Sequence, residues 1–370
     1  MSGFFPFSDR LGPAKVIHVY QPTIDLAGIL VVDNVALGPA IGGLRMAPDV
    51  SLEECFRLAR AMTLKNALAG LPHGGGKSVL VGDPRMPAER KQHLIRAFAH
   101  ALRNETDYIF GPDMGTDETA MAWVKDEIGC SVGLPAVLGG IPLDEVGATG
   151  WGLYHAAEVA APRCGLTLTG ARVVVQGFGA VGKHAARFLS AKGARLVAAS
   201  DSAATIYNPS GIEVEALIRH KSAGHAIAAL PGAQALDRDA IIGIECDIWI
   251  PAARPDVITA ANVARLRAKL IVQGANIPLT EEAERYLHER EVLVLPDFLA
   301  NAGGVICAAF EYRGATRAAA FDAIAERIRA NTEAVLDAAG ARGVTPREAA
   351  RALALERIDA AMQTRRFSIF

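Results

Sequence analysis

The sequence has few cysteines, few aromatic residues and no long uninterrupted apolar run. Its 370 residues include five cysteines, an odd number without CxxC spacing, so a disulfide framework is excluded and a reducing compartment is expected. The longest stretch without a charged residue, 128–143, is broken by glycine and proline. Asp9 and Arg10 stand where a signal peptide would be apolar, which argues against export. We therefore expect a cytoplasmic protein.

The sequence also has no large excess of positive or negative charge. The formal net charge is -2, which gives no general attraction to nucleic acid or to anionic lipid, so neither is an expected partner. None of the nine histidines belongs to an HExxH or a clustered Cys/His pattern, and we predict no metal site. Hydrophobic residues make up 51% of a chain too long for one core. We expect two domains and a small-molecule substrate.

Hydrophobic periodicity divides the chain into two regions that differ in their order of strands and helices, and together they predict an α/β fold. Residues 1–145 combine strands and helices: strands near 15–20, 28–32 and 78–81, a helix from the Ser51 capping box to Gly70, a helix over 88–103 and a strand ending near Asp113. Residues 146–330 alternate strands and helices in the pattern of a parallel doubly wound sheet. The expected strands there are 172–176, 195–200, 247–251, 269–273 and 292–296. The helical residues 331–370 are expected to pack back across the junction.

A glycine-rich GxGxxG pattern follows the strand expected at 172–176 and opens a helix. In this context the glycines permit a tight turn, close approach of a pyrophosphate and close packing of helix on strand. The predicted contact residues are Gly177, Phe178, Gly179, Ala180, Val181 and Gly182. Asp201 ends the next strand, where its carboxylate would accept the ribose hydroxyls and repel a 2′-phosphate. We predict a site for NAD, although Ser200 and Ser202 beside Asp201 could tolerate a phosphate.

The first region supplies three candidate catalytic groups. Lys65 and Lys77 stand twelve residues apart around a glycine-rich turn, and Asp113 adds a carboxylate between a strand and a helix. The end of this turn also resembles a phosphate-binding P-loop, but that motif requires glycine where this chain has Leu71. The P-loop interpretation is therefore excluded.

Several motifs, taken in order, closely resemble the glutamate/leucine/phenylalanine/valine dehydrogenase family. They are Gly42-Gly43-Leu44-Arg45, the segments 62–77 and 111–117, Ile250-Pro251-Ala252, Gly274-Ala275-Asn276 and the stretch 297–305. The match covers most of the chain. The resemblance implies a substrate-binding and oligomerisation domain at 1–145, a Rossmann-type domain at 146–330, and a homo-oligomer.

The resemblance also implies roles for individual residues. Lys65 would bind the substrate carboxylate, Lys77 would be the catalytic lysine, and Asp113 would carry protons to and from the substrate nitrogen. A lysine crowded by a second ammonium and shielded from water gives up its proton more easily, so Lys77 could activate water to attack the imine. The residues implied at the cofactor, mostly at its nicotinamide end, are Thr149, Ala252, Asn276 and Asn301.

Two positions bear on the substrate side chain. Family members that act on glutamate carry lysine where this chain has Ile41 and serine where it has Ala308, and those groups hold the distal carboxylate. An unpaired carboxylate in an apolar pocket would cost several kcal/mol, so an apolar L-amino acid is expected. Gly111 and Ala308 are small and would leave a pocket deep enough for an aromatic ring, which favours phenylalanine over leucine or valine. Gly42 is also expected to contact the substrate.

Two other functions stay open. Glutamate dehydrogenase is favoured by the similarity of the second half, including residues 200–202 and 206–209. A catalytically inactive NAD-binding regulatory paralogue is the alternative from another class, although such a protein would have no need of Lys65, Lys77 and Asp113 together.

Overall fold

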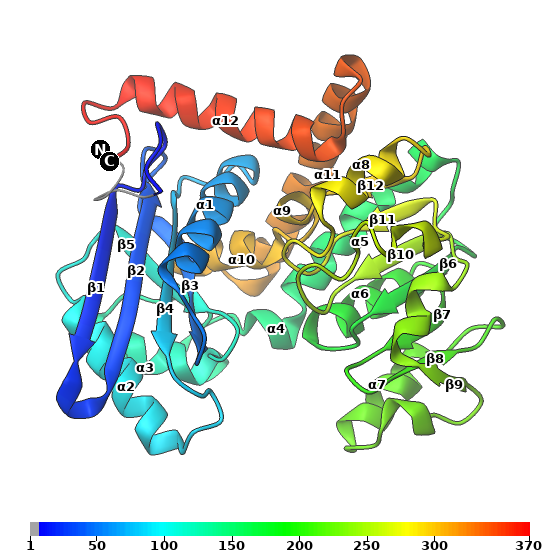
Figure 1. The fold of residues 1–370 in the computed structure, drawn as a ribbon, viewed down its shortest axis with the longest axis horizontal. Helices are drawn as coiled ribbons and strands as arrows, with labels where there is room; N and C mark the ends of the chain where they lie inside the picture. The colour runs from blue at the N-terminus through cyan, green and yellow to red at the C-terminus, as the bar shows by residue number, and fades with distance from the viewer. Residues whose placement is uncertain (1–6) are drawn as a thin grey trace. The chain divides into compact units, whose positions relative to one another are not determined.

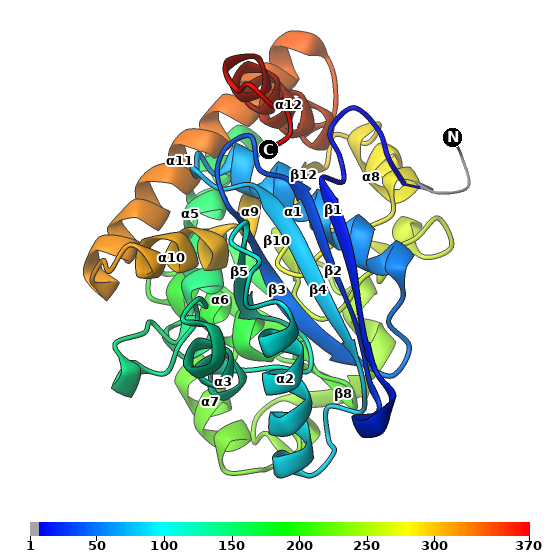
Figure 2. The ribbon, with the colours of Figure 1, turned by 90° about the vertical axis from the view of Figure 1, so that its left-hand side faces the viewer.

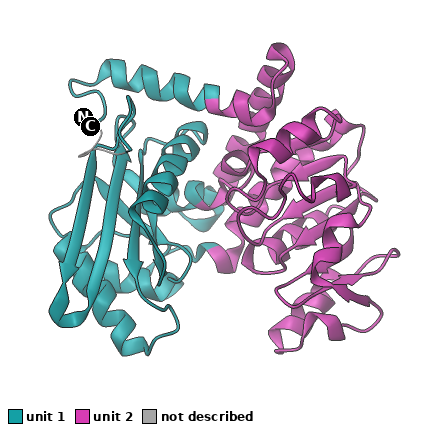
Figure 3. Ribbon diagram, in the orientation of Figure 1, with its two compact units in different colours: residues 1–143, 305–320, 352–370 teal, residues 144–304, 321–351 magenta. Residues whose placement is uncertain are grey.

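The computed structural model describes residues 7–370, which fall into two compact units (Figure 3). Unit 1 contains the residues up to 143, 305–320 and 352–370, and unit 2 contains residues 144–304 and 321–351. The helices α10 (Gly303–Tyr312), α11 (Arg317–Arg342) and α12 (Pro346–Thr364) therefore contribute residues to both units. No helix in the described part of the chain is long and apolar enough to span a membrane.

In the described residues, unit 1 is built on a five-stranded sheet (Figure 1), whose strand order β1-β2-β4-β3-β5 can be followed in Figure 2. The strands are β1 Lys15–Gln21, β2 Leu26–Asn34, β3 Ala40–Ala47, β4 Gly75–Val81 and β5 Tyr108–Pro112. The β1–β2 and β2–β4 pairs are antiparallel, and the β4–β3 and β3–β5 pairs are parallel. The carboxyl ends of β4, β3 and β5 therefore point the same way.

Helices cover both faces of this sheet, because successive strand residues point to opposite sides. On one face, Val31 and Val79 pack against α1 (Leu52–Leu68). On the other face, residues such as Leu30 and Leu80 pack with α2 (Ala88–Ala101) and α3 (Glu118–Ile128). Figure 2 shows α2 and α3 in front of the strands. The face towards α1 carries the candidate catalytic residues.

The strand β3 is absent from the sequence prediction, and β4 begins earlier than expected. Glycine and proline are frequent around residues 38–43, which weakens any strand signal. The glycines before Lys77 pair with β2 in an extended conformation, with Gly75 opposite Asn34 and Gly76 opposite Val32. Lys77 consequently lies inside a central strand rather than just before one.

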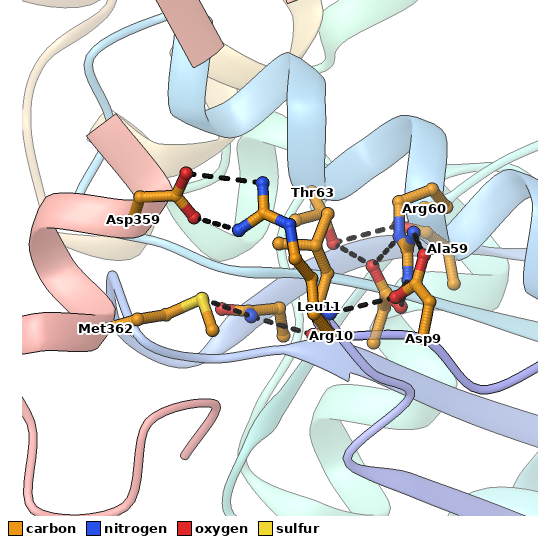
Figure 4. A network of polar contacts seen from close by, with 10 residues as sticks. Asp9, Arg10, Leu11, Ala59, Arg60, Thr63, Asp359 and Met362 are labelled. Atoms are coloured by element: carbon orange, nitrogen blue, oxygen red, sulfur yellow. Dashed lines mark hydrogen bonds and ion pairs between the residues drawn. The ribbon is translucent and has the colours of Figure 1, made fainter. Parts of the chain in front are cut away.

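A network of charges, from the buried Asp33 to the exposed Asp9, anchors α1 (Figure 4). Arg60 donates to both oxygens of Asp33 at 2.8 and 3.0 Å, and also binds Asp9. Thr63 donates to Asp33 at 2.6 Å. Burial raises the pKa of Asp33, and the hydrogen bonds and charge of Arg60 only partly oppose that effect. Because these contacts hold one turn of α1 to β2, they also determine where the following turn, with Lys65, lies.

In the described residues, unit 2 contains a seven-stranded sheet of order β12-β11-β10-β6-β7-β8-β9. The strands are β6 Arg172–Gln176, β7 Arg195–Ser200, β8 Ala204–Tyr207, β9 Gln234–Asp237, β10 Ile248–Pro251, β11 Leu270–Val272 and β12 Leu293–Leu295. The five expected strands pair in parallel, as predicted. The expectation of an all-parallel sheet is wrong at one edge, where β8 and β9 are short and antiparallel.

The helices of unit 2 complete a doubly wound arrangement. They include α4 Leu143–Val146, which starts at the last residue of unit 1, most of α11, and α5 Ala148–Ala160, α6 Ala180–Ser190, α7 Val214–Ser222, α8 Glu281–His288 and α9 Asp297–Ala300. The core of the sheet includes the fully buried Trp249 of β10. The chain runs outward from β6 to β7 on one side and to β10 on the other, so the topological switch point lies at the carboxyl ends of β6 and β10.

Candidate active site

Lys77 and Asp113 form a buried ion pair on the α1 face of the unit 1 sheet. The Nζ atom of Lys77 lies 2.9 Å from Oδ2 of Asp113, and the side chains are 5% and 17% exposed. Lys77 lies on β4 and Asp113 follows β5, with β3 between them, so their backbones are about 10 Å apart. The side chain of Lys77 can cross β3 because Gly43 lies there. A Cβ atom on Gly43 would be 3.2 Å from the Lys77 nitrogen and 2.7 Å from Cβ of Asp113.

Arg45 also belongs to this cluster, although the sequence interpretation assigned it no role. Its Nε atom donates to Oδ2 of Asp113 at 2.8 Å, and its Nη1 atom donates to Glu54 of α1. Burial alone would raise the pKa of Asp113, but the charges of Lys77 and then Arg45 more than offset burial and hold that pKa below its ordinary value. Asp113 is therefore an ionised acceptor. Strand alternation was the available signal, because Arg45 follows Gly43 by two residues.

Lys65 lies in the last turn of α1 and is 7% exposed. The helix approaches β4 closely at this point, since a Cβ atom on Gly75 would lie 2.0 Å from the backbone nitrogen of Thr63. The end of α1 is capped by Arg357, which donates to the carbonyl oxygens of Ala67 and Leu71 at 2.7 and 3.0 Å. The capping contacts fix the position of Lys65. Its role at a substrate carboxylate stays a prediction.

The residues predicted to shape the substrate pocket are all buried in unit 1. Ile41 precedes Gly43 by two residues on β3 and shares the α1 face with Lys77. Gly42 points to the other face, where a Cβ atom would lie 1.9 Å from the Gly76 carbonyl oxygen, so only its backbone could meet a substrate on the α1 face. A Cβ atom on Gly111 would make ordinary contact with Val132 at 3.6 Å. Ala308 lies on α10.

The GxGxxG loop of unit 2 lies at the switch point and fits a dinucleotide. Gly177 has φ +93°, and a Cβ atom on Gly182 would lie 2.0 Å from the Gly177 carbonyl oxygen. A Cβ atom on Gly179 would meet nothing within 4 Å, so the space before the N-terminus of α6 is open. No side chain caps that N-terminus, which leaves its N–H groups for phosphate oxygens. The carbonyl oxygen of the Gln176 side chain is buried with no hydrogen-bond partner in residues 7–370.

A pocket of about 720 Å³ adjoins this loop. The predicted residues that line it are Gly177, Phe178, Gly179, Asp201 and Ala252. The predicted residues Ala180, Val181 and Gly182 form the first turn of α6. The backbone N–H of Ala252 donates to the Gln176 carbonyl at 2.7 Å, so the ends of β6 and β10 meet at the pocket. Its volume is typical of a cofactor site.

Asp201 does not present a free carboxylate to this pocket. Its Oδ1 atom accepts the backbone N–H groups of Ala203 and Ala204 at 2.9 and 3.3 Å, and its Oδ2 atom is paired with Lys221 of α7. Burial raises the pKa of Asp201, but the Lys221 contact and the two backbone N–H groups lower it overall. Lys221 also lines the pocket. Sequence reasoning missed it because twenty residues separate the pair.

The three residues predicted at the nicotinamide end lie outside the lining of that pocket but elsewhere in unit 2. Thr149 lies at the start of α5, and its Oγ1 atom would be 3.0 Å from a Cβ atom on Gly304. Asn301 donates through Nδ2 to Oδ1 of Asn276 at 3.1 Å. The Oδ1 atom of Asn301 is buried and has no hydrogen-bond partner within residues 7–370. Such an acceptor fits a ligand N–H.

In the described residues, no group of three or more histidine, cysteine, aspartate or glutamate side chains is placed to hold a metal ion. In unit 1, the side chains of Lys77, Asp113 and Arg45 form one charged cluster.

A dinucleotide loop at the switch point of a doubly wound sheet defines a nucleotide-dependent oxidoreductase, and the buried lysine–aspartate pair suits proton transfer at the substrate. Comparison with protein families then identifies the group. This chain belongs to the Glutamate/Leucine/Phenylalanine/Valine dehydrogenase family, whose model matches residues 139–366, while the dimerisation-domain model of the same family matches residues 13–129. The family and the two-domain α/β fold predicted from sequence are confirmed. The protein is an oxidoreductase that acts on the CH–NH₂ group of amino acids.

Individual relatives extend over most of the chain. The NADP(+)-dependent glutamate dehydrogenase of Pyrobaculum calidifontis is 41% identical over 389 aligned residues, covering 95% of this chain and 91% of the relative. Hetero-hexameric glutamate dehydrogenase from Thermus thermophilus, in its leucine-bound form, has a TM-score of 0.87 at 32% identity, covering 95% and 90% of the two chains. L-tryptophan dehydrogenase from Nostoc punctiforme has a TM-score of 0.70 at 27% identity, covering 95% and 97%.

Proposed function

We propose that this protein catalyses the reversible oxidative deamination of an L-amino acid to its 2-oxo acid and ammonia. The observation that carries this proposal is the Lys77–Asp113 pair, buried and joined at 2.9 Å on one sheet face. The nicotinamide dinucleotide, when bound to unit 2, supplies the chemistry of accepting a hydride from the α carbon. The side chains of unit 1 bind the substrate and transfer protons to and from it.

The roles follow from charge and position. The ammonium of Lys65 would pair with the α-carboxylate of the substrate. Lys77 would pass its proton to Asp113 across their 2.9 Å contact and, once neutral, would take a proton from the attacking water, while Asp113 would exchange protons with the substrate nitrogen. Arg45 holds Asp113 in its ionised form and in a fixed orientation through the 2.8 Å contact. Arg45 therefore acts as a positioning residue.

L-glutamate is the substrate that we propose first. The glutamate dehydrogenases of Pyrobaculum calidifontis and Thermotoga maritima are 41% and 40% identical to this chain over 95% and 77% of its length. Such similarity supports the same substrate, in place of the phenylalanine expected from pocket size.

An apolar L-amino acid is the second candidate, because Ile41 is 2% exposed and offers no partner for a distal carboxylate. The relative that is an L-tryptophan dehydrogenase also supports it. NADH absorbance with a panel of L-amino acids would decide between the two. Turnover of glutamate alone supports the first candidate, turnover of phenylalanine, leucine or tryptophan the second, and silence across the panel contradicts both.

Ile41→Lys should raise kcat/KM for glutamate at least tenfold, and lower it for apolar substrates, because the new ammonium would pair with the distal carboxylate. Ile41→Met is the matched control, since it keeps a neutral side chain of similar size and should leave the preference unchanged. An unaltered glutamate rate in a folded Ile41→Lys variant would show that Ile41 does not face the substrate side chain.

We propose that NAD and NADP are both accepted. Asp201 supports NAD, since a carboxylate at this point can bind ribose hydroxyls. Lys221 supports NADP, because its ammonium neutralises Asp201 and lines the same pocket, where it could pair with a 2′-phosphate. The NADP(+) dependence of the Pyrobaculum calidifontis relative agrees with that second use.

A homo-oligomer assembled through unit 1 is proposed as well. The family model over residues 13–129 is that of a dimerisation domain, and the edge strand β1 exposes Val16 and Tyr20. Apolar side chains on an unpaired strand edge favour association. Mass photometry of the purified protein should therefore give a mass above the 39.0 kDa of one chain.

A further inference from the structure

The loop after β11 contains a residue in a strained backbone conformation. Ile277 has φ +48°, in the left-handed region that β-branched residues rarely adopt because their side chains crowd the backbone there. It directly follows Asn276. Two hydrogen bonds hold it: its N–H donates to Oδ2 of Asp297 at 2.9 Å, and its carbonyl oxygen accepts the N–H of Asp256 at 2.9 Å. Strain that is held in this way is common next to functional residues.

The carboxylate of Asp297 is itself oriented by a half-buried arginine far along the chain. The Nη2 atom of Arg347 donates to Oδ1 of Asp297 at 2.8 Å and to Oε1 of Gln273 at 3.0 Å. Glu284 accepts two further bonds from the same guanidinium, at 2.7 and 2.8 Å. The side chains of Asp297 and Glu284 are each 6% exposed and that of Arg347 is 20% exposed. A planar guanidinium with several partners has one allowed orientation.

Asp297 also connects to the second asparagine. It begins α9, and its carbonyl oxygen accepts the backbone N–H of Asn301 at 2.8 Å. The side chain of Asn301 donates to Asn276 and, at 3.3 Å, to the carbonyl oxygen of Gly274. Both asparagines therefore depend on Asp297. The buried Oδ1 atom of Asn301, with no partner in residues 7–370, is the acceptor that this arrangement presents.

We propose that Arg347, acting through Asp297, is a positioning residue that holds Asn276 and Asn301 in the geometry that binds the nicotinamide half of the cofactor. The inference rests on the proposed cofactor site. It assigns a role to Asp297, the first residue of the motif 297–305, and to Arg347, which lies outside the motifs of the sequence analysis. Arg347 contacts both Asp297 and Glu284, so its removal takes a positive charge away from both carboxylates and releases the loop that Asp297 holds.

The test compares the binding of a ligand that contains nicotinamide with the binding of one that lacks it. Calorimetry would measure the Kd of NADH, and of ADP-ribose, which lacks nicotinamide, for the full chain and for Arg347→Met. We expect the Kd of NADH to rise at least tenfold and that of ADP-ribose to change less than twofold. Arg347→Lys, which keeps a charge for Asp297, should recover part of the affinity for NADH. Arg172→Met is the matched control, because Arg172 pairs with Asp247 and begins the strand that ends at Gln176.

The outcomes are distinct. Unchanged NADH affinity in a folded Arg347→Met variant overturns the inference, as does an equal loss of NADH and ADP-ribose affinity, which would indicate general loosening. Should Arg347→Met fail to fold, Asp297→Asn keeps the shape but removes the charge that orients Arg347, and the same selective loss of NADH is expected. Absence of NADH binding to the unaltered protein would instead overturn the cofactor site itself.

Discussion

At the scale of single residues, the candidate chemistry depends on which charges face one another. Lys77 lies opposite a carboxylate, whereas the sequence suggested crowding by a second ammonium. Lys77 and Arg45 hold the pKa of Asp113 below its ordinary value, so Asp113 is ready to accept a proton only when the charges around it change during the reaction. The pair is suited to exchanging one proton over a short distance.

Lys77→Ala should lower kcat at least a thousandfold, because Arg45, the other cation at Asp113, does not give up its proton and cannot replace Lys77 in proton transfer. The Kd of NADH should change less than threefold, since the glycine loop lies in unit 2. Stopped-flow absorbance and calorimetry measure these two quantities. Lys91→Ala, at a partly exposed position of α2, serves as control. Activity within tenfold of the unaltered enzyme would contradict the assignment of Lys77.

Lys221→Ala should weaken NADP binding at least tenfold while changing NAD binding less than threefold, because only NADP has a 2′-phosphate for the ammonium to meet. The affinities of 2′,5′-ADP and 5′-AMP, measured by calorimetry, isolate this effect from the nicotinamide. Lys192→Ala, in a turn after α6, is a control of the same type. Equal losses for both nucleotides would indicate a structural role for Lys221.

At the scale of elements, β3 decides the geometry of the cluster. It lies between β4 and β5 and presents Ile41, Gly43 and Arg45 on one face. A side chain at the middle position would stand between Lys77 and Asp113. The absence of a Cβ atom at Gly43 is therefore a requirement of the ion pair, and not merely of the strand.

Gly43→Ala should lower kcat at least a hundredfold while leaving the protein folded. The added Cβ atom would lie 2.7 Å from Cβ of Asp113 and 3.2 Å from the Lys77 nitrogen, which forces the two side chains apart. Gly243→Ala makes the same change where nothing lies within 4 Å and should be neutral. Turnover and circular dichroism are the readouts. Undiminished turnover would mean that the pair does not need its present separation.

At the scale of the whole molecule, stability should depend on two buried histidines of unit 2. Burial lowers the pKa of His155 and of His184 to about 4, below an ordinary value near 6.5. Between those values the unfolded chain binds more protons than the folded one, so stability falls as pH falls from about 6.5 to about 4 and is fully present above that window. Each histidine contributes on the order of 1 kcal/mol per pH unit.

The free energy of unfolding in urea, measured at pH 7 and pH 5, should therefore drop in acid, and the drop should shrink in His155→Gln. The exposed His93 gives the control variant His93→Gln, for which no change in the dependence is expected. Fluorescence can follow unfolding locally, because the rings of Trp151 and His155 are 4.3 Å apart. An identical pH dependence in His155→Gln would show that this histidine is not responsible.

Local pattern was enough to predict much of this protein. The glycine loop after β6, the capping box of α1 and the five parallel strands of unit 2 all followed from the sequence. Each of these depends on residues that are neighbours along the chain, or on a motif whose spacing is imposed by one element. Elements with weak local signals, such as β3 with its glycines, could not be found in this way.

The sequence by itself determined the family, because several motifs match it in order, and most of the elements, because periodicity reflects local backbone geometry. Tertiary structure alone decided that Arg45 binds Asp113, that Lys221 neutralises Asp201 and that Arg347 orients Asp297. Those partners are separated by 20 to 68 residues. Long-range pairs are formed by the packing of whole elements, and no local preference of the backbone specifies them.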